Sequence, residues 1–257
     1  MKFRGYLALG VVSLGLLAAD PVQRLVVAPW VTLRPGRRIP VLGRWIQLMS
    51  WWVRTTMSRI GGATIPVPER IVPPEPGKLI LMNHQSLFDI PLVVRTVGHG
   101  YPRIVTRNRY GRSIPLISHM VRLYQYPTVE PSANKKELSR MLDDLERAGR
   151  ESDVPIALFP EGTRTRDGEI GRWRRAGLRR LLAARDWTVY IFVADGFWKA
   201  GKYSEIAAET PRIDGEFAHV GTLEWTDPTA DPEPFIQEAR QMMIDGLNAM
   251  RGVSAPA

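Results

Sequence analysis

A histidine and an aspartate five positions apart, His84 and Asp89, are the residues of this sequence best suited to proton transfer. They lie in the segment NHQSLFD, directly after the apolar run 78–82. Histidine titrates near neutral pH and can accept a proton from an alcohol, while a carboxylate on Nδ1 fixes the tautomer and stabilises the imidazolium. The pair therefore indicates general-base catalysis, with a hydrogen-bonded turn histidine as the structural alternative.

The spacing of the pair restricts where the two residues can lie. On one regular helix, side chains five residues apart point about 140° away from each other. We therefore expect His84 in a turn and Asp89 in the first turn of the helix that follows. Asn83 or Ser86 would cap that helix.

A second charged segment, FPEGTRTRDG at 159–168, follows another short apolar run. The pattern is typical of a strand that ends in a tight turn. A turn that only reverses the chain does not need Glu161, Arg164 and Arg166 so close together. The structural alternative is that Glu161 and Arg164 pair with each other and make the turn rigid.

Apolar runs and helical periodicity predict the elements that position these segments. Apolar runs and helical patterns alternate along the chain, which indicates an α/β fold with a mixed, largely parallel sheet flanked by helices. In such sheets ligands bind at the carboxyl ends of strands, where both charged segments begin. The expected strands are 78–82, 103–106, 156–159, 189–193 and 220–225, and the expected helices are 135–150, 174–185 and 234–251.

Together the two segments resemble the glycerolipid acyltransferase family, which includes the lysophosphatidate acyltransferases. NHQSLFD matches the family's NHxSxxD block at every fixed position, and FPEGTRTRDG matches its FPEGTRS-type block nearly throughout. The resemblance covers roughly residues 78–195. It implies an O-acyltransferase that moves a fatty acyl group from acyl-CoA or an acylated carrier protein to a lysophospholipid, with lysophosphatidate giving phosphatidate.

The resemblance also implies roles for individual residues. His84, oriented by Asp89, would deprotonate the acceptor hydroxyl for direct acyl transfer, without a covalent acyl-enzyme, a metal or a bound cofactor. Backbone N–H groups would stabilise the oxyanion. Arg164 would bind an anionic group such as a phosphate, which a guanidinium can chelate. The implied substrate-binding residues are Asn83, Ser86, Glu161, Gly162, Thr163 and Arg164.

Parts of the sequence depart from the family pattern. Glu130 or a neighbour stands where the family usually carries an arginine that contributes to glycerol-phosphate binding, and the run 189–195 lacks the usual proline. Residues 173–175, Trp-Arg-Arg, would contact the phosphates of the thioester donor or form a solvated helix start. The alternatives are therefore an acyltransferase with a non-glycerophosphate lipid acceptor and a catalytically silent membrane-binding protein with the same fold.

The composition limits the chemistry and the partners. The 257 residues include no cysteine, which excludes disulfides, thiolate zinc sites and cysteine nucleophiles. Nine of the 35 basic residues but one of the 26 acidic residues lie in 1–60, so this segment carries +8 of the net charge of +9. It is also apolar and holds four of the eight tryptophans, which favours a membrane surface over nucleic acid.

The N-terminal segment is expected to hold the enzyme on a membrane. Residues 5–19 are uncharged but shorter than the roughly 20 residues of a usual spanning helix. A retained anchor, inserted shallowly or as a hairpin, is favoured over a cleaved signal peptide. An apolar stripe in 40–60 either packs on the domain or, as favoured here, lies among lipid headgroups. We predict an anchoring segment over 1–62, a catalytic domain over 63–257, and a place on the cytoplasmic face of the inner or plasma membrane.

Overall fold

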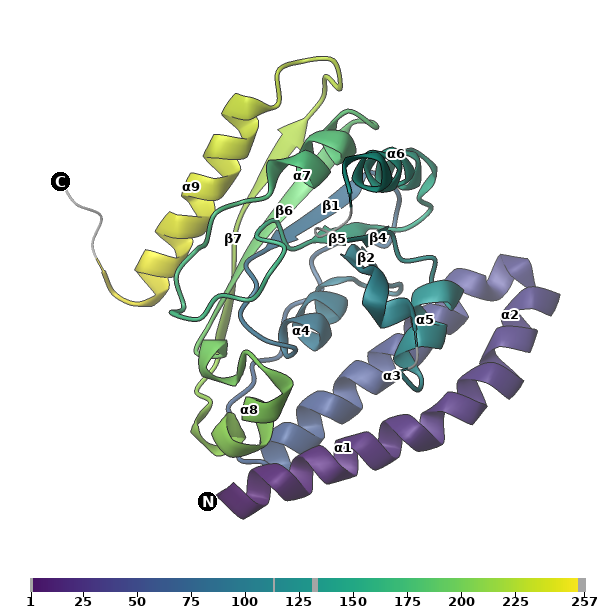
Figure 1. Cartoon of the computed structure of the whole chain (residues 1–257), viewed down its shortest axis with the longest axis vertical. Helices are drawn as coiled ribbons and strands as arrows, with labels where there is room; N and C mark the ends of the chain where they lie inside the picture. The colour runs from purple at the N-terminus through teal and green to yellow at the C-terminus, as the bar shows by residue number, and fades with distance from the viewer. Residues whose placement is uncertain (1, 113, 131–133, 254–257) are drawn as a thin grey trace.

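The computed structural model describes residues 2–112, 114–130 and 134–253. Its central sheet has the strand order β2-β5-β1-β6-β7 (Figure 1). The first four of these strands are parallel to their neighbours, and β7 runs antiparallel to β6 along one edge. The strands are β1 (Lys78–Met82), β2 (Arg103–Ile104), β5 (Ile156–Leu158), β6 (Trp187–Asp195) and β7 (Glu216–Trp225). The predicted mixed, largely parallel α/β sheet is thus confirmed.

Both faces of the sheet are covered, as the continuous apolar sequence of β1 requires. The helices that cover the sheet are α3 (Arg38–Arg59), α4 (Asp89–Thr96), α5 (Ile117–Leu123), α6 (Lys135–Glu151), α7 (Arg175–Leu182) and α9 (Glu233–Met250), and α8 (Tyr203–Glu209) follows β6. Ile80 and Met82 pack into one core cluster with α3, α4 and α5, whereas Leu79 and Leu81 pack into a second cluster with α6, α7 and α9. Figure 1 shows the two helical layers.

The strand predicted over 103–106 is divided between two sheets. The amide of Val105 still donates to Ala157 of β5, but the amide of Thr106 donates to Pro127 instead. The chain therefore leaves the central sheet at this point. It forms a small parallel sheet from β3 (Thr106–Arg107) and β4 (Thr128–Val129).

The N-terminal helix is longer than the uncharged stretch 5–19 predicts. It runs without a break over Lys2–Leu33, through α1 (Lys2–Val22), a π-helical turn (Gln23–Val27) and α2 (Ala28–Leu33). By length and composition this is the one helix among the described residues that could cross a membrane. Asp20 and Arg24, one turn apart, pair at 2.9 Å, so neither charge interrupts the helix.

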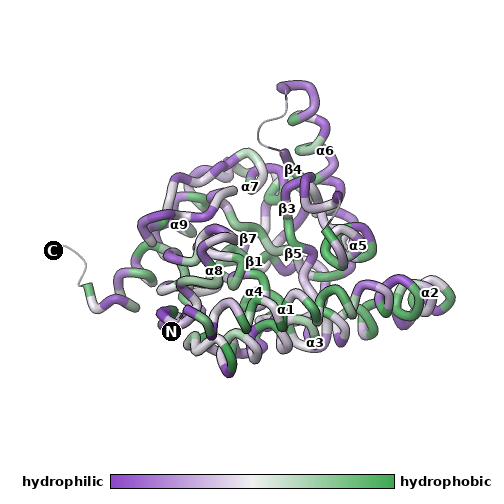
Figure 2. Tube along the Cα trace, turned by 60° about the horizontal axis from the view of Figure 1, so that its bottom comes forward, coloured by the Kyte–Doolittle hydropathy of each residue, from purple (hydrophilic) through white to green (hydrophobic). Residues whose placement is uncertain are grey.

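α3 (Arg38–Arg59) returns along α1, so that the two helices form a hairpin beneath the sheet (Figures 1 and 2). The apolar stripe predicted for this helix faces the domain: Leu42, Ile46 and Met57 are buried in the same core cluster as Ile80. The interpretation that this stripe lies among lipid headgroups is therefore wrong. Short 3-10 turns complete the fold at Pro35–Arg37, Asn108–Gly111, Trp198–Ala200 and Thr210–Arg212.

Candidate active site

The two charged segments lie next to each other because their strands are neighbours. NHQSLFD leaves the carboxyl end of β1 and FPEGTRTRDG leaves that of β5, and the two strands are paired in parallel. His84 lies in the turn after β1, and Asp89 is the first residue of α4. His84 Nδ1 lies 2.7 Å from Asp89 Oδ2. The arrangement predicted from the spacing is confirmed.

The Asp89 carboxylate is fully buried and is held by the turn that it faces. Besides His84 Nδ1, its Oδ2 accepts hydrogen bonds from the backbone N–H groups of Gln85 (2.6 Å) and Ser86 (2.8 Å). A carboxylate that accepts from Nδ1–H leaves Nε2 as the free, basic nitrogen of the ring. The His84 side chain is 17% exposed, so the ring can meet a substrate.

The segment after β5 holds His84 from the other side. The ring of Phe159 stacks on the imidazole, with centroids 4.4 Å apart. Glu161 Oε1 accepts the backbone N–H of His84 at 2.9 Å, and the N–H of Thr165 donates to the His84 carbonyl at 2.8 Å. The backbone of the histidine is therefore fixed at both its donor and its acceptor.

Glu161 is a buried carboxylate with two backbone donors. Its Oε2 accepts the N–H of Gly171 at 2.9 Å, and only 3% of the residue is exposed. Burial raises the pKa of Glu161 to about 7, because the two backbone hydrogen bonds do not offset the cost of desolvation and the nearby Asp89 charge raises it further. Glu161 therefore binds the backbone of His84 rather than a neighbouring charged side chain.

The pairing of Glu161 with Arg164, which was the structural alternative, is wrong. The Arg164 guanidinium instead donates to the carbonyl of Gly201. Thr163 is exposed beside it. Gly162 has φ of +64° and lies under Arg174, whose Cδ would be 2.7 Å from a Cβ at this position. The left-handed conformation favours glycine here, whereas the exposed Arg174 side chain could shift to admit a Cβ.

Asn83 and Ser86 are both buried and bond to the backbone of segments far away in the sequence. The Asn83 amide exchanges two hydrogen bonds of 2.8 Å with the backbone of Ala194 in β6, and the Ser86 hydroxyl donates to Ala200 at 2.7 Å. Neither side chain caps α4, so that prediction is wrong. Their role in substrate binding stays a prediction.

Arg107 contacts the second charged segment, a contact that the sequence interpretation missed. It lies in β3, its guanidinium donates to the Gly162 carbonyl at 2.9 Å, and its partner in the β4 register is Val129. It is thus on the strand next to Glu130, where the family's arginine is expected. The signal was present in the sequence, because Arg107, Arg109 and Arg112 follow directly on a predicted strand.

The segment 173–175 is not a solvated helix start as a whole, and its contact with the phosphates of the thioester donor stays a prediction. Trp173 is buried in the core, and Arg175 forms an ion pair with Glu233 of α9. Only Arg174, which is exposed and lies against Gly162, is near the site. Among the described residues there is no group of three or more His, Cys, Asp or Glu side chains that could hold a metal ion.

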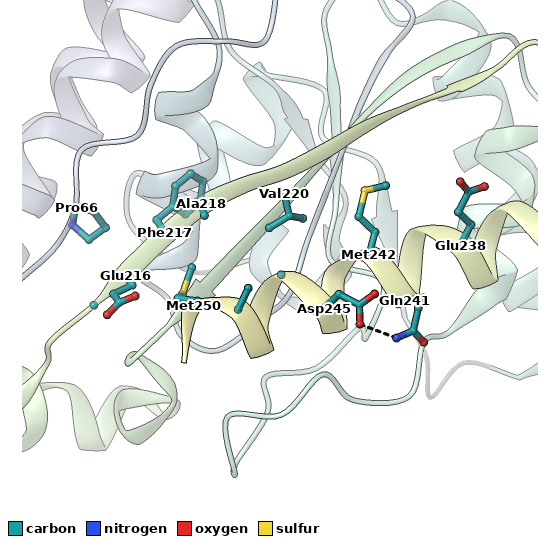
Figure 3. Close-up of a pocket in the computed structure, with 13 residues that line it drawn as sticks. Pro66, Glu216, Phe217, Ala218, Val220, Glu238, Gln241, Met242, Asp245 and Met250 are labelled. Carbon is teal, nitrogen blue, oxygen red and sulfur yellow. Dashed lines mark hydrogen bonds between the residues drawn. The ribbon is translucent and has the colours of Figure 1, made fainter. Parts of the chain in front are cut away.

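An open groove of about 1120 Å³ lies elsewhere, between β7 and α9 (Figure 3). Its apolar floor includes Phe217, Val220 and Met242, and acidic side chains such as Glu238 and Asp245 stand along α9. None of the lining residues belongs to either charged segment. The chemistry therefore places the candidate active site at His84 and not in this groove.

Comparison with known proteins identifies the family and the fold of the chain. The family model described as Acyltransferase matches residues 64–193, which is 130 of the 257 residues and includes both charged segments. No curated protein matches the chain in sequence. A crystal structure described as the 1-acyl-sn-glycerophosphate (LPA) acyltransferase, PlsC, from Thermotoga maritima is similar over 100% of both chains, with a TM-score of 0.69 and 16% identity. The protein shares its fold with that enzyme, and the chain belongs to the acyltransferase family.

Proposed function

We propose that this acyltransferase moves a fatty acyl group from a thioester donor, acyl-CoA or an acylated carrier protein, to a hydroxyl of a lysophospholipid. Lysophosphatidate, with phosphatidate as product, is the first acceptor to test. The observation that carries the proposal is the 2.7 Å contact between His84 Nδ1 and the buried Asp89 carboxylate at the carboxyl end of β1. It prepares Nε2 to accept a proton.

The proposed reaction is a direct transfer. His84 Nε2 takes the proton of the acceptor hydroxyl as that oxygen attacks the thioester carbonyl. The C–S bond breaks as the ester C–O bond forms, and the imidazolium returns the proton to the departing thiolate. Asp89 stabilises the imidazolium between these steps and holds the ring in one tautomer. Free thiol and the acylated lipid leave, and no cofactor is consumed.

Arginines around Gly162 supply the charge for an anionic acceptor. Arg107 donates to the Gly162 carbonyl and Arg174 lies against the same residue, whereas Arg164 is turned toward Gly201. We place the acceptor's phosphate near Arg107 and Arg174, because guanidinium groups chelate phosphate oxygens. In this arrangement Arg107 replaces the arginine that the middle block lacks.

Arg107→Ala is expected to raise the KM for a phosphate-bearing lysophospholipid about tenfold, the effect of losing roughly 1.4 kcal/mol of binding. The kcat for a neutral monoacylglycerol should not change. Steady-state kinetics on both acceptors measure this. Equal KM values for wild type and variant on the phosphate acceptor would remove Arg107 from the binding site.

The acceptor is identified by offering labelled acyl-CoA or acyl-carrier protein with a panel of lysophospholipids and non-phosphate lipids. Transfer to lysophosphatidate supports phosphatidate formation. Transfer to a different lysophospholipid keeps the proposed reaction with another acceptor. Transfer to a non-glycerophosphate lipid alone supports the second candidate, an acyltransferase with a non-glycerophosphate acceptor, which Glu130 in the middle block favours. Failure of every acceptor would leave the silent membrane-binding protein as the remaining interpretation.

We further propose that the helical hairpin, taken as the whole segment 2–59 with the π-helical turn and α2, holds the protein on a membrane. Large apolar side chains stay exposed along it, including Leu25 (75%), Trp30 (50%) and Leu33 (80%). Exposed apolar side chains in such number favour a lipid surface. Figure 2 shows the many hydrophobic residues of the hairpin in green. The cytoplasmic face stays a prediction that rests on the basic residues of 1–60.

Replacing Leu25, Trp30 and Leu33 together with serine is expected to weaken binding to anionic phospholipid vesicles at least about tenfold, because the loss of even one fully buried apolar side chain costs roughly 1.5–3 kcal/mol. Vesicle co-sedimentation measures the loss. The matched control replaces Val67, Ile114 and Tyr203, which are exposed apolar residues outside the hairpin. Equal losses in the two triple variants would contradict anchoring by the hairpin.

A further inference from the structure

Arg251, the C-cap residue that follows α9, joins two segments next to the candidate active site. Its guanidinium forms a bidentate ion pair with Asp195 at the end of β6, with Nε–Oδ2 of 2.6 Å and Nη2–Oδ1 of 3.0 Å. Nη2 also donates to the carbonyl of Gly168 at 3.0 Å, and Nη1 pairs with the exposed Glu169. One side chain thus links a strand end to the last residue of FPEGTRTRDG.

Gly168 packs closely against the guanidinium of Arg251. Its φ is +86°, and a Cβ at this position would lie 2.8 Å from Arg251 Nη2 and 2.8 Å from Trp198 Cδ1. A side chain at residue 168 would therefore collide with the arginine. The contact between Arg251 and the turn is close packing as well as a hydrogen bond.

Gln85, the neighbour of His84, contacts the same two acceptors from inside the protein. Its fully buried amide donates to Asp195 Oδ1 at 3.0 Å and to the Gly168 carbonyl at 3.2 Å, and it accepts the N–H of Phe197 at 3.0 Å. Its backbone N–H donates to Asp89. The side chains of Arg251 and Gln85 therefore hold Asp195 and Gly168 together. Because Gln85 directly follows His84 in the chain, this contact also restrains the histidine.

The turn held by Arg251 also contacts the histidine backbone. The N–H of Thr165 donates to the His84 carbonyl, and the Thr165 hydroxyl donates to Asp167, the residue before Gly168. Movement of Gly168 away from Asp195 would therefore be transmitted to His84 by two routes, through Gln85 and through Thr165. Neither route involves a substrate atom.

We propose that Arg251 is a positioning residue for acyl transfer: by clamping Asp195 to Gly168 it fixes the orientation of His84. The proposal rests on the proposed function of His84 as the base. It gives the C-terminal end of α9 a task in the reaction, although Arg251 contacts neither His84 nor Asp89. Small errors in the placement of a base cost rate without weakening substrate binding, so the expected signature lies in kcat.

The test compares three variants in the labelled acyl-transfer assay. Arg251→Ala removes the clamp, and Arg251→Lys keeps a charge but loses the bidentate geometry. Arg179→Ala is the matched control, because Arg179 pairs with Glu233 at the other end of α9. We expect kcat to fall about tenfold for Arg251→Ala and less for Arg251→Lys, with the KM for donor and acceptor within about twofold of wild type. Arg179→Ala should keep the wild-type kcat.

A double-mutant cycle separates positioning from general loss of stability. If the clamp acts as a unit, Asp195→Asn combined with Arg251→Ala lowers kcat no further than the more damaging single change. An unchanged kcat in Arg251→Ala, an equal loss in Arg179→Ala, or additive losses in the double variant would each overturn the inference. If Arg251→Ala does not fold, the test uses Arg251→Lys instead. A wild-type kcat in folded Arg251→Lys would then overturn the inference. A wild-type protein without transfer activity would overturn the proposed function together with this inference. An active wild type with an unaffected Arg251→Ala would overturn only the positioning role.

Discussion

Replacing His84 with alanine is expected to lower the rate of acyl transfer at least about 100-fold, which is the usual contribution of a general base. The loss should appear in kcat, because the ring is proposed to act on the proton of a bound acceptor. The fold should survive, since the His84 side chain is partly exposed and its backbone bonds to Glu161 and Thr165 do not need the ring. Initial rates with labelled donor, together with the circular dichroism spectrum, measure both expectations.

Asp89→Asn is the companion variant for this prediction. The amide keeps an acceptor for the turn but cannot stabilise an imidazolium, so that kcat should fall while the substrate KM values stay close to wild type. His219 is the control histidine, because it lies on β7 and contacts Thr222. Wild-type rates in His84→Ala, or an equal loss in His219→Ala, would contradict the assignment of the base.

Glu161→Gln is expected to give the second largest effect, a fall in kcat of about tenfold or more. A glutamine can accept the N–H of His84 with its oxygen, but its NH₂ group would then face the N–H of Gly171, where Glu161 Oε2 now accepts. Two donors that face each other in a buried site repel and leave Gly171 unpaired. His84 would shift as the turn relaxes. A wild-type kcat in a folded Glu161→Gln would contradict this account.

The same substitution has a consequence for stability as a function of pH. The pKa of Glu161 is about 7 in the folded protein, above its ordinary value of 4.5, because the carboxylate is desolvated. The folded protein therefore binds this proton more tightly than the unfolded chain. The stability that the proton contributes is fully present below about pH 4.5 and is lost as the pH rises through about 7.

The size of that loss is on the order of 3 kcal/mol, because each pKa unit corresponds to about 1.36 kcal/mol. Glu161→Gln has no such proton. The difference in unfolding free energy between wild type and variant should therefore change in favour of the variant as the pH rises from 4.5 to 8. Urea unfolding across this range measures the difference. Parallel pH profiles for the two proteins would contradict a raised pKa at this position.

The geometry of the site was predictable because it is local in sequence. The apolar runs before NHQSLFD and FPEGTRTRDG gave two buried strands, and parallel neighbours bring their carboxyl ends together. The five-residue spacing of His84 and Asp89 allows few geometries, and a turn followed by a helix start is the one found. The prediction of an α/β sheet likewise depended on apolar runs of ordinary length.

Partners far apart in the chain were not predictable in this way. Glu161 and Arg164 are close in sequence and of opposite charge, yet Glu161 accepts backbone N–H groups and Arg164 bonds to Gly201. Arg251 is a single basic residue at a helix end, and only the fold brings it to Asp195. Backbone acceptors and distant carboxylates leave no periodic signal in a sequence.

For the N-terminal helices, likewise, the sequence did not show which surface covers their apolar faces. Periodicity identified the apolar stripe of α3 but not its partner. In the structure the stripe packs against the core of the domain. Ala8 and Val12 of α1 belong to the same core cluster as Ile80 of the sheet. The hairpin and the catalytic part therefore share one core, while the division at residue 62 into an anchoring and a catalytic part stays a prediction.

The most direct test of the account is the initial rate at which the purified full-length protein, in vesicles, transfers a labelled acyl group from acyl-CoA or acyl-carrier protein to lysophosphatidate and to the other lipid acceptors. His84→Ala is measured beside it at equal concentration. We expect an acylated lipid product with wild type and a rate lower by at least about 100-fold with the variant. Absence of product with every acceptor, or equal rates for the two proteins, would contradict it.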